Sequence, residues 1–157
     1  MGFETHDHGR CIAEALAHAE RVCDMNGLHM TPVRRRVLEI LLERHRAMGA
    51  YDILDRLRAE GLGSQPPVAY RALDFLTTHR FVHRIEGLNA FIACTRPAHG
   101  HTPAFLICRA CERVVEAETA HAGGELGRAA ATAGFKVERM VREAVGLCPA
   151  CRTAQPA

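Results

Sequence analysis

The sequence predicts an α+β protein in two parts, with helices and a hairpin first and a small α/β unit after them. Before residue 80, apolar residues recur at the spacing of amphipathic helices. Residues 81–93 then alternate between apolar and polar side chains around a Gly-Leu-Asn turn, which is typical of a β-hairpin. In the second half, short alternating segments flank an alanine-rich stretch, which predicts strands and one helix. The 157 residues suit one ordinary domain or two small ones.

The composition sets limits on the class of protein. Hydrophobic residues make up 48% of the chain and aromatic residues 5%, so its cores must be aliphatic. With a formal net charge of only +2, any contact with nucleic acid must come from a local patch. The sequence has neither the apolar segment of a signal peptide nor a run long enough to span a membrane, so we expect a cytoplasmic protein without a membrane partner. In that compartment, seven cysteines favour metal ligands or reduced thiols over disulfides.

The first two helices are predicted from their apolar faces and their ends. The first covers 11–26 and ends near Gly27. The second begins at Thr31-Pro32, because threonine is a favoured N-cap and proline is favoured at the first helical position. We expect the second helix to continue as far as Gly49.

Two further helices and a hairpin complete the first part. A short helix is predicted over 50–60, and Pro66 or Pro67 opens the next, which runs to residue 80. The hairpin turns at residues 87–89. Compact helices followed by a β-hairpin form the winged helix-turn-helix pattern.

The second part begins after a linker at 94–103. We expect strands at 104–108 and 113–118, a helix over 119–133 and a third strand over 135–148. A unit of this size buries little surface, so it needs a covalent or metal link, or a partner.

Four cysteines in this part predict a structural zinc site. Each Cys-x-x-Cys turn places its two sulfurs on one side of a knuckle, and two turns complete the tetrahedron that zinc prefers. A zinc ion held in this way would fasten the C-terminal tail to the sheet, and its binding free energy would contribute to folding. The predicted ligands are Cys108, Cys111, Cys148 and Cys151.

Other uses of these cysteines are less consistent with the sequence. A redox-active dithiol of the thioredoxin type opens a helix after a strand, and we expect neither pair to do so. A zinc deaminase needs a His-x-Glu motif and a Pro-Cys-x-x-Cys motif. Here Cys148 precedes Pro149, and no suitable His-x-Glu occurs.

A second group of polar side chains gathers near the linker. It comprises His83 in the hairpin, Cys94 after the hairpin, His99 and His101 in the linker, and Glu116 in a later strand. Taken singly, each is as well explained as a surface or core residue. Together, imidazole, thiolate and carboxylate suit four-coordinate zinc. Because the ligands come from both parts of the chain, a bound metal would control the orientation of one part relative to the other.

The segment PPVAYRALDFLTTHRFVHRIE, followed by Cys94, His-x-His and the paired cysteines, resembles the ferric uptake regulator family. Within that family it most resembles the zinc uptake regulator branch, from about residue 11 to Cys151. The resemblance implies a winged-helix DNA-binding domain at 1–93, a hinge at 94–103, and a dimerisation and zinc-binding domain at 104–157. It also implies a homodimer that binds palindromic operators in double-stranded DNA when loaded with metal.

The resemblance also implies roles for individual residues. The four paired cysteines match the structural zinc site, whereas His83, Cys94, His101 and Glu116 match the regulatory zinc site, giving two zinc ions per protomer. Cys94 is the discriminating residue, because a soft ligand favours zinc over ferrous iron. The linker sequence is Ala-His-Gly-His, which has fewer potential metal ligands than the linker of iron sensors. His99 therefore stays an alternative to Glu116 as the fourth regulatory ligand.

Contacts with DNA are expected from the helix that begins at Pro66 or Pro67. Tyr70 and Arg71 match the family's Tyr-Arg pair, and an arginine near the first turn can form a bidentate pair with guanine. A surface ion pair with Asp74 is the alternative for Arg71. Three arginines on the second helix are expected either to face phosphates or to be solvated: Arg34, Arg35 and Arg36.

The sequence therefore predicts a zinc-responsive, dimeric repressor of zinc-uptake genes, without a small-molecule substrate. No nucleophile, base and oxyanion donor come together in its motifs, so we expect no enzyme. Two alternatives stay open: a related regulator that senses iron, manganese or peroxide, and a redox-switched protein that uses its Cys-x-x-Cys pairs as a thiol sensor.

Overall fold

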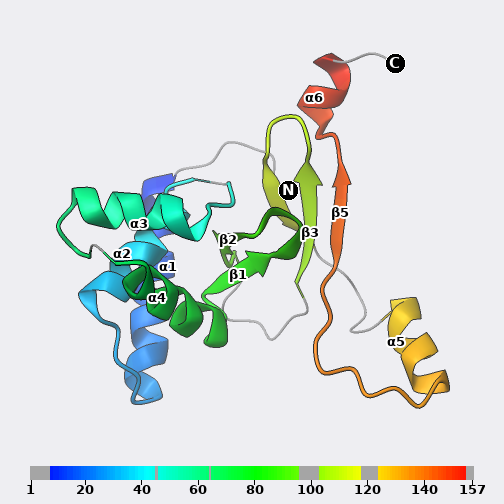
Figure 1. The fold of residues 1–157 in the computed structure, drawn as a ribbon, viewed down its shortest axis with the longest axis horizontal. Helices are drawn as coiled ribbons and strands as arrows, with labels where there is room; N and C mark the ends of the chain where they lie inside the picture. The colour runs from blue at the N-terminus through cyan, green and yellow to red at the C-terminus, as the bar shows by residue number, and fades with distance from the viewer. Residues whose placement is uncertain (1–7, 45, 64, 96–102, 118–123, 155–157) are drawn as a thin grey trace.

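The computed structural model places a helical bundle beside a hairpin and a separate three-stranded sheet (Figure 1). It describes residues 8–44, 46–63, 65–95, 103–117 and 124–154. The helices are α1 (His8–Met25), α2 (Pro32–Leu42), α3 (Ala50–Ala59), α4 (Pro66–Thr78), η1 (Glu86–Leu88), α5 (Gly124–Thr132) and α6 (Pro149–Ala154). The strands are β1 (Val82–Ile85), β2 (Ala90–Ala93), β3 (Ala104–Cys108), β4 (Val114–Ala117) and β5 (Glu143–Gly146). The predicted order of a helical region followed by a mixed α/β region is confirmed.

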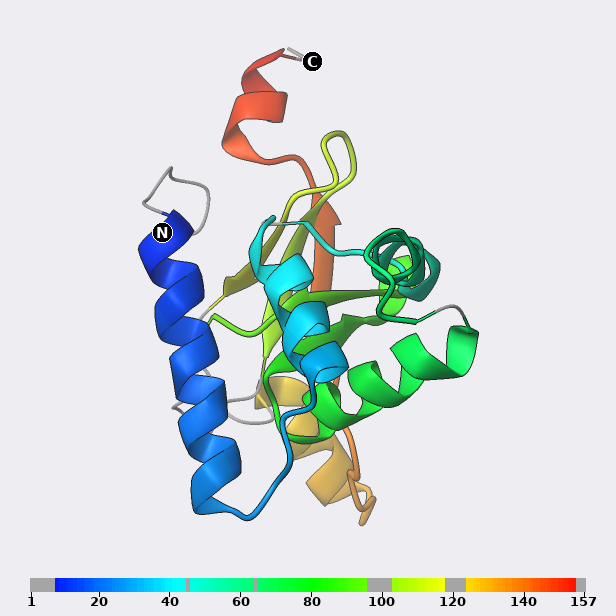
Figure 2. The ribbon, with the colours of Figure 1, turned by 90° about the vertical axis from the view of Figure 1, so that its left-hand side faces the viewer.

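The helical bundle has an aliphatic core, as the composition predicts. Most of its large, fully buried side chains come from α2, α3 and α4: Val37, Ile40, Leu41, Ile53, Leu54, Leu57, Leu73 and Leu76. Helix α1 lies along α2 and closes one side of this core (Figure 2). At the start of α2, the Thr31 side chain accepts a hydrogen bond from the Arg34 amide at 3.2 Å, so the predicted cap is present.

Helix α2 is shorter than the sequence predicts, because the chain after it joins the hairpin. The helix ends at Leu42 and not at Gly49. Met48 forms a bridge with Phe91, with both backbone hydrogen bonds at 2.8 Å. This pairing needs extended backbone at Met48, and it overrides the helical pattern of the preceding residues.

The hairpin forms as predicted. Strands β1 and β2 pair antiparallel from Val82↔Ala93 to Ile85↔Ala90. The turn between them is η1, followed by Asn89 in the left-handed region at φ 46°. Asparagine tolerates this conformation better than most residues, which explains why the turn occurs here.

The second sheet has the strand order β4-β3-β5, with β3 and β4 antiparallel and β3 and β5 parallel. The third strand predicted over 135–148 is only four residues long, because only Glu143–Gly146 pair with β3. Helix α5 begins later than the predicted helix, and residues 118–123 of that prediction lie outside the described residues. Strand β5 is an edge strand of this sheet, and α6 lies beyond one end of it (Figure 1).

A small apolar cluster joins the hairpin to the second sheet. Ile85 and Ile92 from the hairpin pack with Phe105, Ile107 and Val114 from the sheet, and each is at most 7% exposed. The two parts of the chain therefore share a packed interface. Among the described residues, no helix is both long enough and apolar enough to cross a membrane.

The arginines of α2 act within the bundle. Arg35 pairs with Glu20 and Glu39, and Arg34 lies 3.7 Å from the centre of the Phe75 ring. Arg36 bonds to both oxygens of Glu60 at 2.7 Å and to Glu39 and Glu43 at 3.0 Å. Acidic and aromatic side chains of the bundle thus contact all three arginines, which the sequence did not predict. Contact with phosphates stays a prediction, and Arg35 is exposed, as expected for a solvated side chain.

Replacing Arg36 with alanine should destabilise the bundle, because three carboxylates would lose the cation that they share. We expect Tm, measured by circular dichroism, to fall by about 3 to 6 °C at low salt, and by less at high salt. The hydrogen bond from Arg36 lowers the pKa of the Glu60 carboxyl. The contribution is therefore complete above the ordinary glutamate pKa of 4.5 and is lost as the pH falls through the lowered value.

The matched control is Arg10→Ala. Arg10 pairs with Glu14 on α1, and their side chains are 81% and 68% exposed, so the Tm should barely change. Equal losses in the two variants would contradict the structural role of Arg36.

Candidate metal centres and nucleic-acid surface

The four paired cysteines converge at one end of the second sheet. Their sulfur atoms all lie within 4.8 Å of one another. Cys108 ends β3, Cys111 lies in the turn before β4, Cys148 precedes α6, and Cys151 lies within α6. Two turns that are 40 residues apart in the sequence, at Cys108 and Cys148, therefore form one cluster.

Backbone hydrogen bonds shape the first turn and join it to β5. The Glu112 amide donates to the Cys108 carbonyl at 2.9 Å, and Glu112 itself has φ 59°. The Arg109 amide donates to the Gly146 carbonyl at 2.9 Å, which ties the turn to the end of β5. The sulfurs accept backbone hydrogen bonds too, with Cys148 N to Cys108 Sγ at 3.3 Å and Cys151 N to Cys148 Sγ at 3.5 Å.

The crowding affects the thiols in opposite directions. Backbone N–H groups of Cys148 and Cys111 lower the pKa of the Cys108 thiol to about 6. Hydrogen bonding to the sulfurs of Cys148 and Cys111 raises the pKa of the Cys151 thiol to about 12. Four thiolates in so small a space need a positive charge among them, and a thiophilic divalent ion supplies it.

One argument against a redox role is wrong. The second pair, Cys148-Pro149-Ala150-Cys151, does open a helix after a strand, because α6 follows β5 directly. The sequence argument missed this because no helix was predicted after residue 148, whereas α6 spans Pro149–Ala154. What favours a metal site instead is that both pairs meet in one cluster.

A second buried group brings together residues from the hairpin, the segment after it and the sheet. Ligand atoms of His83, Cys94 and Glu116 lie within 4.8 Å of one another. His83 Nε2 is 3.6 Å from Glu116 Oε1, and these side chains are 11% and 5% exposed. The other two predicted candidates, His99 and His101, lie outside the described residues. We refer to His83, Cys94 and Glu116 as the hinge group.

The sequence analysis missed Thr95, which orients the hinge group. Its amide and hydroxyl both donate to Glu116 Oε2, at 3.1 and 2.9 Å. The other carboxylate oxygen, Oε1, is thereby directed toward His83. Residues that orient a metal-binding carboxylate in this way tune the affinity of the site. Adjacency to Cys94 was the one signal for Thr95 in the sequence.

The predicted DNA-contact residues lie at the start of α4 and are exposed. The Tyr70 side chain is 43% exposed, and no ion pair joins Arg71 to Asp74, both of which lie in the described part of the chain. Tyr51, at the start of α3, is 62% exposed and was not singled out from the sequence. It lies off the apolar stripe of its helix, which was a usable signal.

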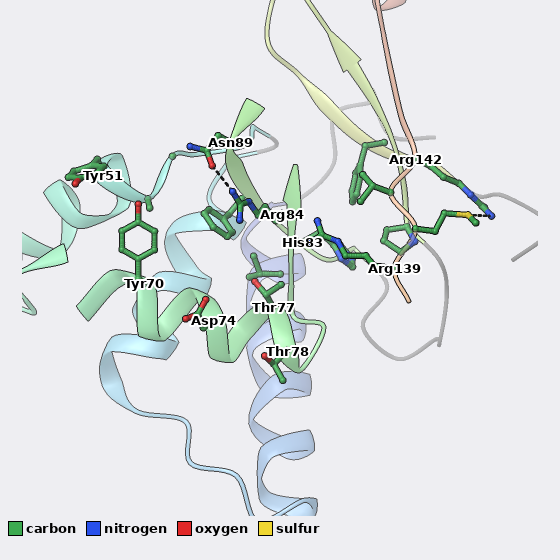
Figure 3. A pocket seen from close by; sticks show the side chains of 18 residues that line it. Tyr51, Tyr70, Asp74, Thr77, Thr78, His83, Arg84, Asn89, Arg139 and Arg142 are labelled. Carbon is green, nitrogen blue, oxygen red and sulfur yellow. Dashed lines mark hydrogen bonds between the residues drawn. The ribbon is translucent and has the colours of Figure 1, made fainter. Parts of the chain in front are cut away.

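Tyr51 and Tyr70 line one end of a cleft of about 870 Å³. His83, Arg139 and Arg142 line the other end (Figure 3). The cleft thus connects the exposed tyrosines to the neighbourhood of the hinge group.

Comparison with known proteins places the chain among metal-dependent regulators. Residues 25–142 match the Ferric uptake regulator family. The zinc uptake regulation protein of Escherichia coli (strain K12) is 39% identical over 141 residues, covering 88% of this chain and 81% of that protein. A zinc uptake regulator solved with zinc and DNA has a TM-score of 0.86 and 38% identity, over 91% of this chain and 96% of that one.

A third relative, XcZur, has been solved in two forms. The holo form has a TM-score of 0.80, and the match covers 88% of this chain and 96% of that one. The apo form has a TM-score of 0.52, and the match covers 90% of this chain and 98% of that one. The identity is 37% in both cases, so the two TM-scores differ because the two backbones differ. The present structure is more similar to the holo form than to the apo form. The resemblance predicted from the motifs is confirmed.

Replacing Cys148 with serine should dismantle the cysteine cluster. Cys148 is 5% exposed, and it contributes both a sulfur and the amide that bonds to Cys108. We expect loss of the zinc ion most resistant to chelation, a Tm lower by about 10 °C or more, and rapid proteolysis of the C-terminal tail.

Zinc content by mass spectrometry and limited proteolysis are the measurements. Cys11→Ser, at an exposed position on α1, is the control and should change neither. A Cys148→Ser protein that keeps its zinc and its protected tail would contradict the assignment.

Proposed function

This chain belongs to the ferric uptake regulator family, and on that premise we propose that it is a zinc-responsive repressor of zinc-uptake genes. It is a transcriptional regulator and not an enzyme. In this proposal, residues 1–93 bind DNA, 94–103 form the hinge, and 104–157 form the dimerisation and zinc-binding domain. The protein binds a palindromic operator in double-stranded DNA as a homodimer.

The hinge group is the observation that carries this proposal. Its ligands come from β1, from the segment after β2, and from β4, so any ion that binds them all joins the hairpin to the second sheet. The thiolate of Cys94 favours zinc over ferrous or manganous ions. The position of Glu116 beside His83 supports Glu116 over His99, and His101 is the ligand that we propose completes the site.

The cysteine cluster has a different position and a different task. Its four ligands all belong to the second part of the chain, so it stabilises that part without linking it to the helical bundle. We therefore assign two zinc ions to each protomer, one structural and one regulatory. A four-thiolate site retains zinc strongly, whereas a site shared between domains responds to free zinc.

Regulation then follows from the position of the DNA-binding surface. Zinc, when bound, supplies the charge that holds the hinge ligands together. The hairpin seated on the sheet fixes α4, so that Arg71 meets guanine in the major groove and Tyr70 and Tyr51 lie beside it. The zinc uptake regulator solved with zinc and DNA, at a TM-score of 0.86, supports this arrangement.

The second sheet supplies a surface for the homodimer. Strand β5 has an unpaired edge among the described residues, and exposed edges favour pairing with another strand. Exposed apolar side chains lie on the same part of the molecule: Leu106, Leu126, Phe135 and Val145, which are 43%, 66%, 68% and 66% exposed. A second copy of the chain would bury them.

The Cys94→Ser variant tests the proposal. The probe is a DNA duplex selected from a random-sequence library by the wild-type protein at saturating zinc. We expect wild-type binding, followed by fluorescence anisotropy, to rise steeply with buffered free zinc. Cys94→Ser should keep one chelation-resistant zinc but need at least a tenfold higher free zinc concentration for the same binding.

Cys23→Ser changes another buried cysteine and is the control, which should bind as the wild type does. Ferrous or manganous ions acting at lower concentration than zinc would favour a sister metalloregulator. Binding controlled by mild oxidation at constant zinc would favour the thiol sensor. Normal zinc-dependent binding by Cys94→Ser would remove the regulatory site.

A further inference from the structure

Strand β5 contacts the turn of the hairpin through a single carboxylate. Glu143 Oε1 accepts a hydrogen bond from the Glu86 amide at 2.6 Å, and Glu143 Oε2 accepts one from the Gly87 amide at 2.8 Å. We refer to these two hydrogen bonds as the latch. Resting on the proposed function, we propose that Glu143 is a positioning residue: its latch holds the hairpin on the sheet and so lowers the zinc concentration at which the protein binds DNA.

The latch matches the charge of one partner to the geometry of the other. Two consecutive amides of η1 point in nearly the same direction, and a carboxylate has two oxygens to meet them. Hydrogen bonds to an ionised acceptor are shorter and stronger than neutral ones. The contact joins residues 57 positions apart, so it forms only when the hairpin and the sheet are together.

Gly87 is adapted to this contact. A Cβ atom built at Gly87 would lie 2.8 Å from Glu143 Oε2. Apart from the chain neighbours of Gly87, no other atom lies within 3.4 Å of that Cβ position. Its φ lies outside the left-handed region, so the backbone itself tolerates a side chain. The one atom that a Cβ at residue 87 would meet is at the flexible end of the Glu143 side chain, so Gly87→Ala should displace the carboxylate without straining the hairpin.

Neighbouring charges keep Glu143 compatible with the acidic turn. Glu86 forms an ion pair with Arg139 from the segment before β5, and its other oxygen is 3.6 Å from Arg84 Nε. Arg84 in turn donates to Asn89 at 2.9 Å, and both line the cleft with Arg139 (Figure 3). The two arginines offset the second carboxylate at this turn.

The register of the sheet connects the latch to the hinge group. Phe105 on β3 pairs with Glu116 on β4 and with Glu143 on β5. Residues directly opposite each other project from the same face of a sheet, so both carboxylates face the hairpin. Between them, Phe105 is 3% exposed, and its ring centre lies 5.5 Å from that of His83.

One rigid row thus carries a metal-binding carboxylate at one end and the latch at the other. Seating the hairpin on the sheet makes both contacts at once, together with the apolar cluster. Any contact made only in the seated state adds to the affinity for every ligand that selects that state. Losing the latch should therefore weaken zinc binding at the hinge group and DNA binding together, while the cysteine cluster stays unaffected.

The test compares Glu143→Gln, Gly87→Ala and the double variant with the wild type. Glutamine offers one acceptor oxygen in place of two, and the Cβ of alanine at 87 should push the Glu143 carboxylate away from the amides. We expect each single variant to need about three- to tenfold more free zinc for half-maximal binding of the selected duplex. The double variant should need no more free zinc than the single variant that binds the duplex less tightly, because both changes break the same contact.

Glu138→Gln is the control, since Glu138 is an exposed carboxylate in the segment before β5. It should leave the zinc midpoint unchanged. A second readout needs no DNA: amide exchange at Glu86 and Gly87 in the zinc-loaded protein, followed by NMR, should be slow in the wild type and at least fivefold faster in Glu143→Gln.

The outcomes separate the latch from the function on which it rests. If the wild type shows no zinc-dependent DNA binding, the proposed function fails, whereas the amide exchange still reports on the latch. If the wild type responds to zinc and the latch variants match Glu138→Gln in midpoint and exchange, the latch is overturned. Additive effects in the double variant would also overturn it.

Discussion

The seating of the hairpin on the second sheet is the interaction on which the rest of the structure depends. A small apolar cluster, in which Ile85 and Ile92 meet Phe105, forms its centre. The five buried side chains of this cluster bury too little surface to hold the two parts of the chain together by themselves. Polar contacts around the cluster therefore determine how stable the contact between hairpin and sheet is. The hinge group lies on one side of this cluster, and Glu143 contacts the turn on the other. A modest interface with adjustable rim contacts is what a regulated protein requires.

The two candidate metal groups differ in position, and the proposed function assigns them different roles for that reason. The cysteine cluster joins β3, the following turn and the start of α6, all within one part of the chain, so under the proposed function its loss would affect folding. The hinge group joins β1, β4 and the segment after β2, so under the proposed function its loss would affect orientation. Thr95 orients a side chain of the hinge group, because it donates hydrogen bonds to one oxygen of Glu116 and leaves the other oxygen directed at His83. The ligand types differ between the two groups, but it is the position of the ligands in the fold that suggests which group stabilises folding and which one regulates.

Much of this was predictable from the sequence, and the exceptions share a cause. Periodicity, the Thr31 cap and the hairpin turn are local signals, and each element that they predict is present. The end of α2 and the length of β5 were misjudged, because pairing with Phe91 and with β3 decides them from a distance, and α6 was not predicted at all. The cysteine spacing and the mixed donor set pointed to both metal groups. Thr95, Glu143 and the Arg36–Glu60 ion pair act through contacts 21 to 57 residues apart, which no local pattern reveals.

The central claim is that zinc at the hinge group and DNA select the same seated state. Native mass spectrometry of the protein across buffered free zinc, with and without the selected duplex, tests it most directly. The account predicts two zinc ions per protomer, one resistant to mild chelation and one lost early, with the weaker ion binding more tightly when the duplex is present. One zinc ion throughout, or a weaker ion whose affinity is the same with and without DNA, would contradict it.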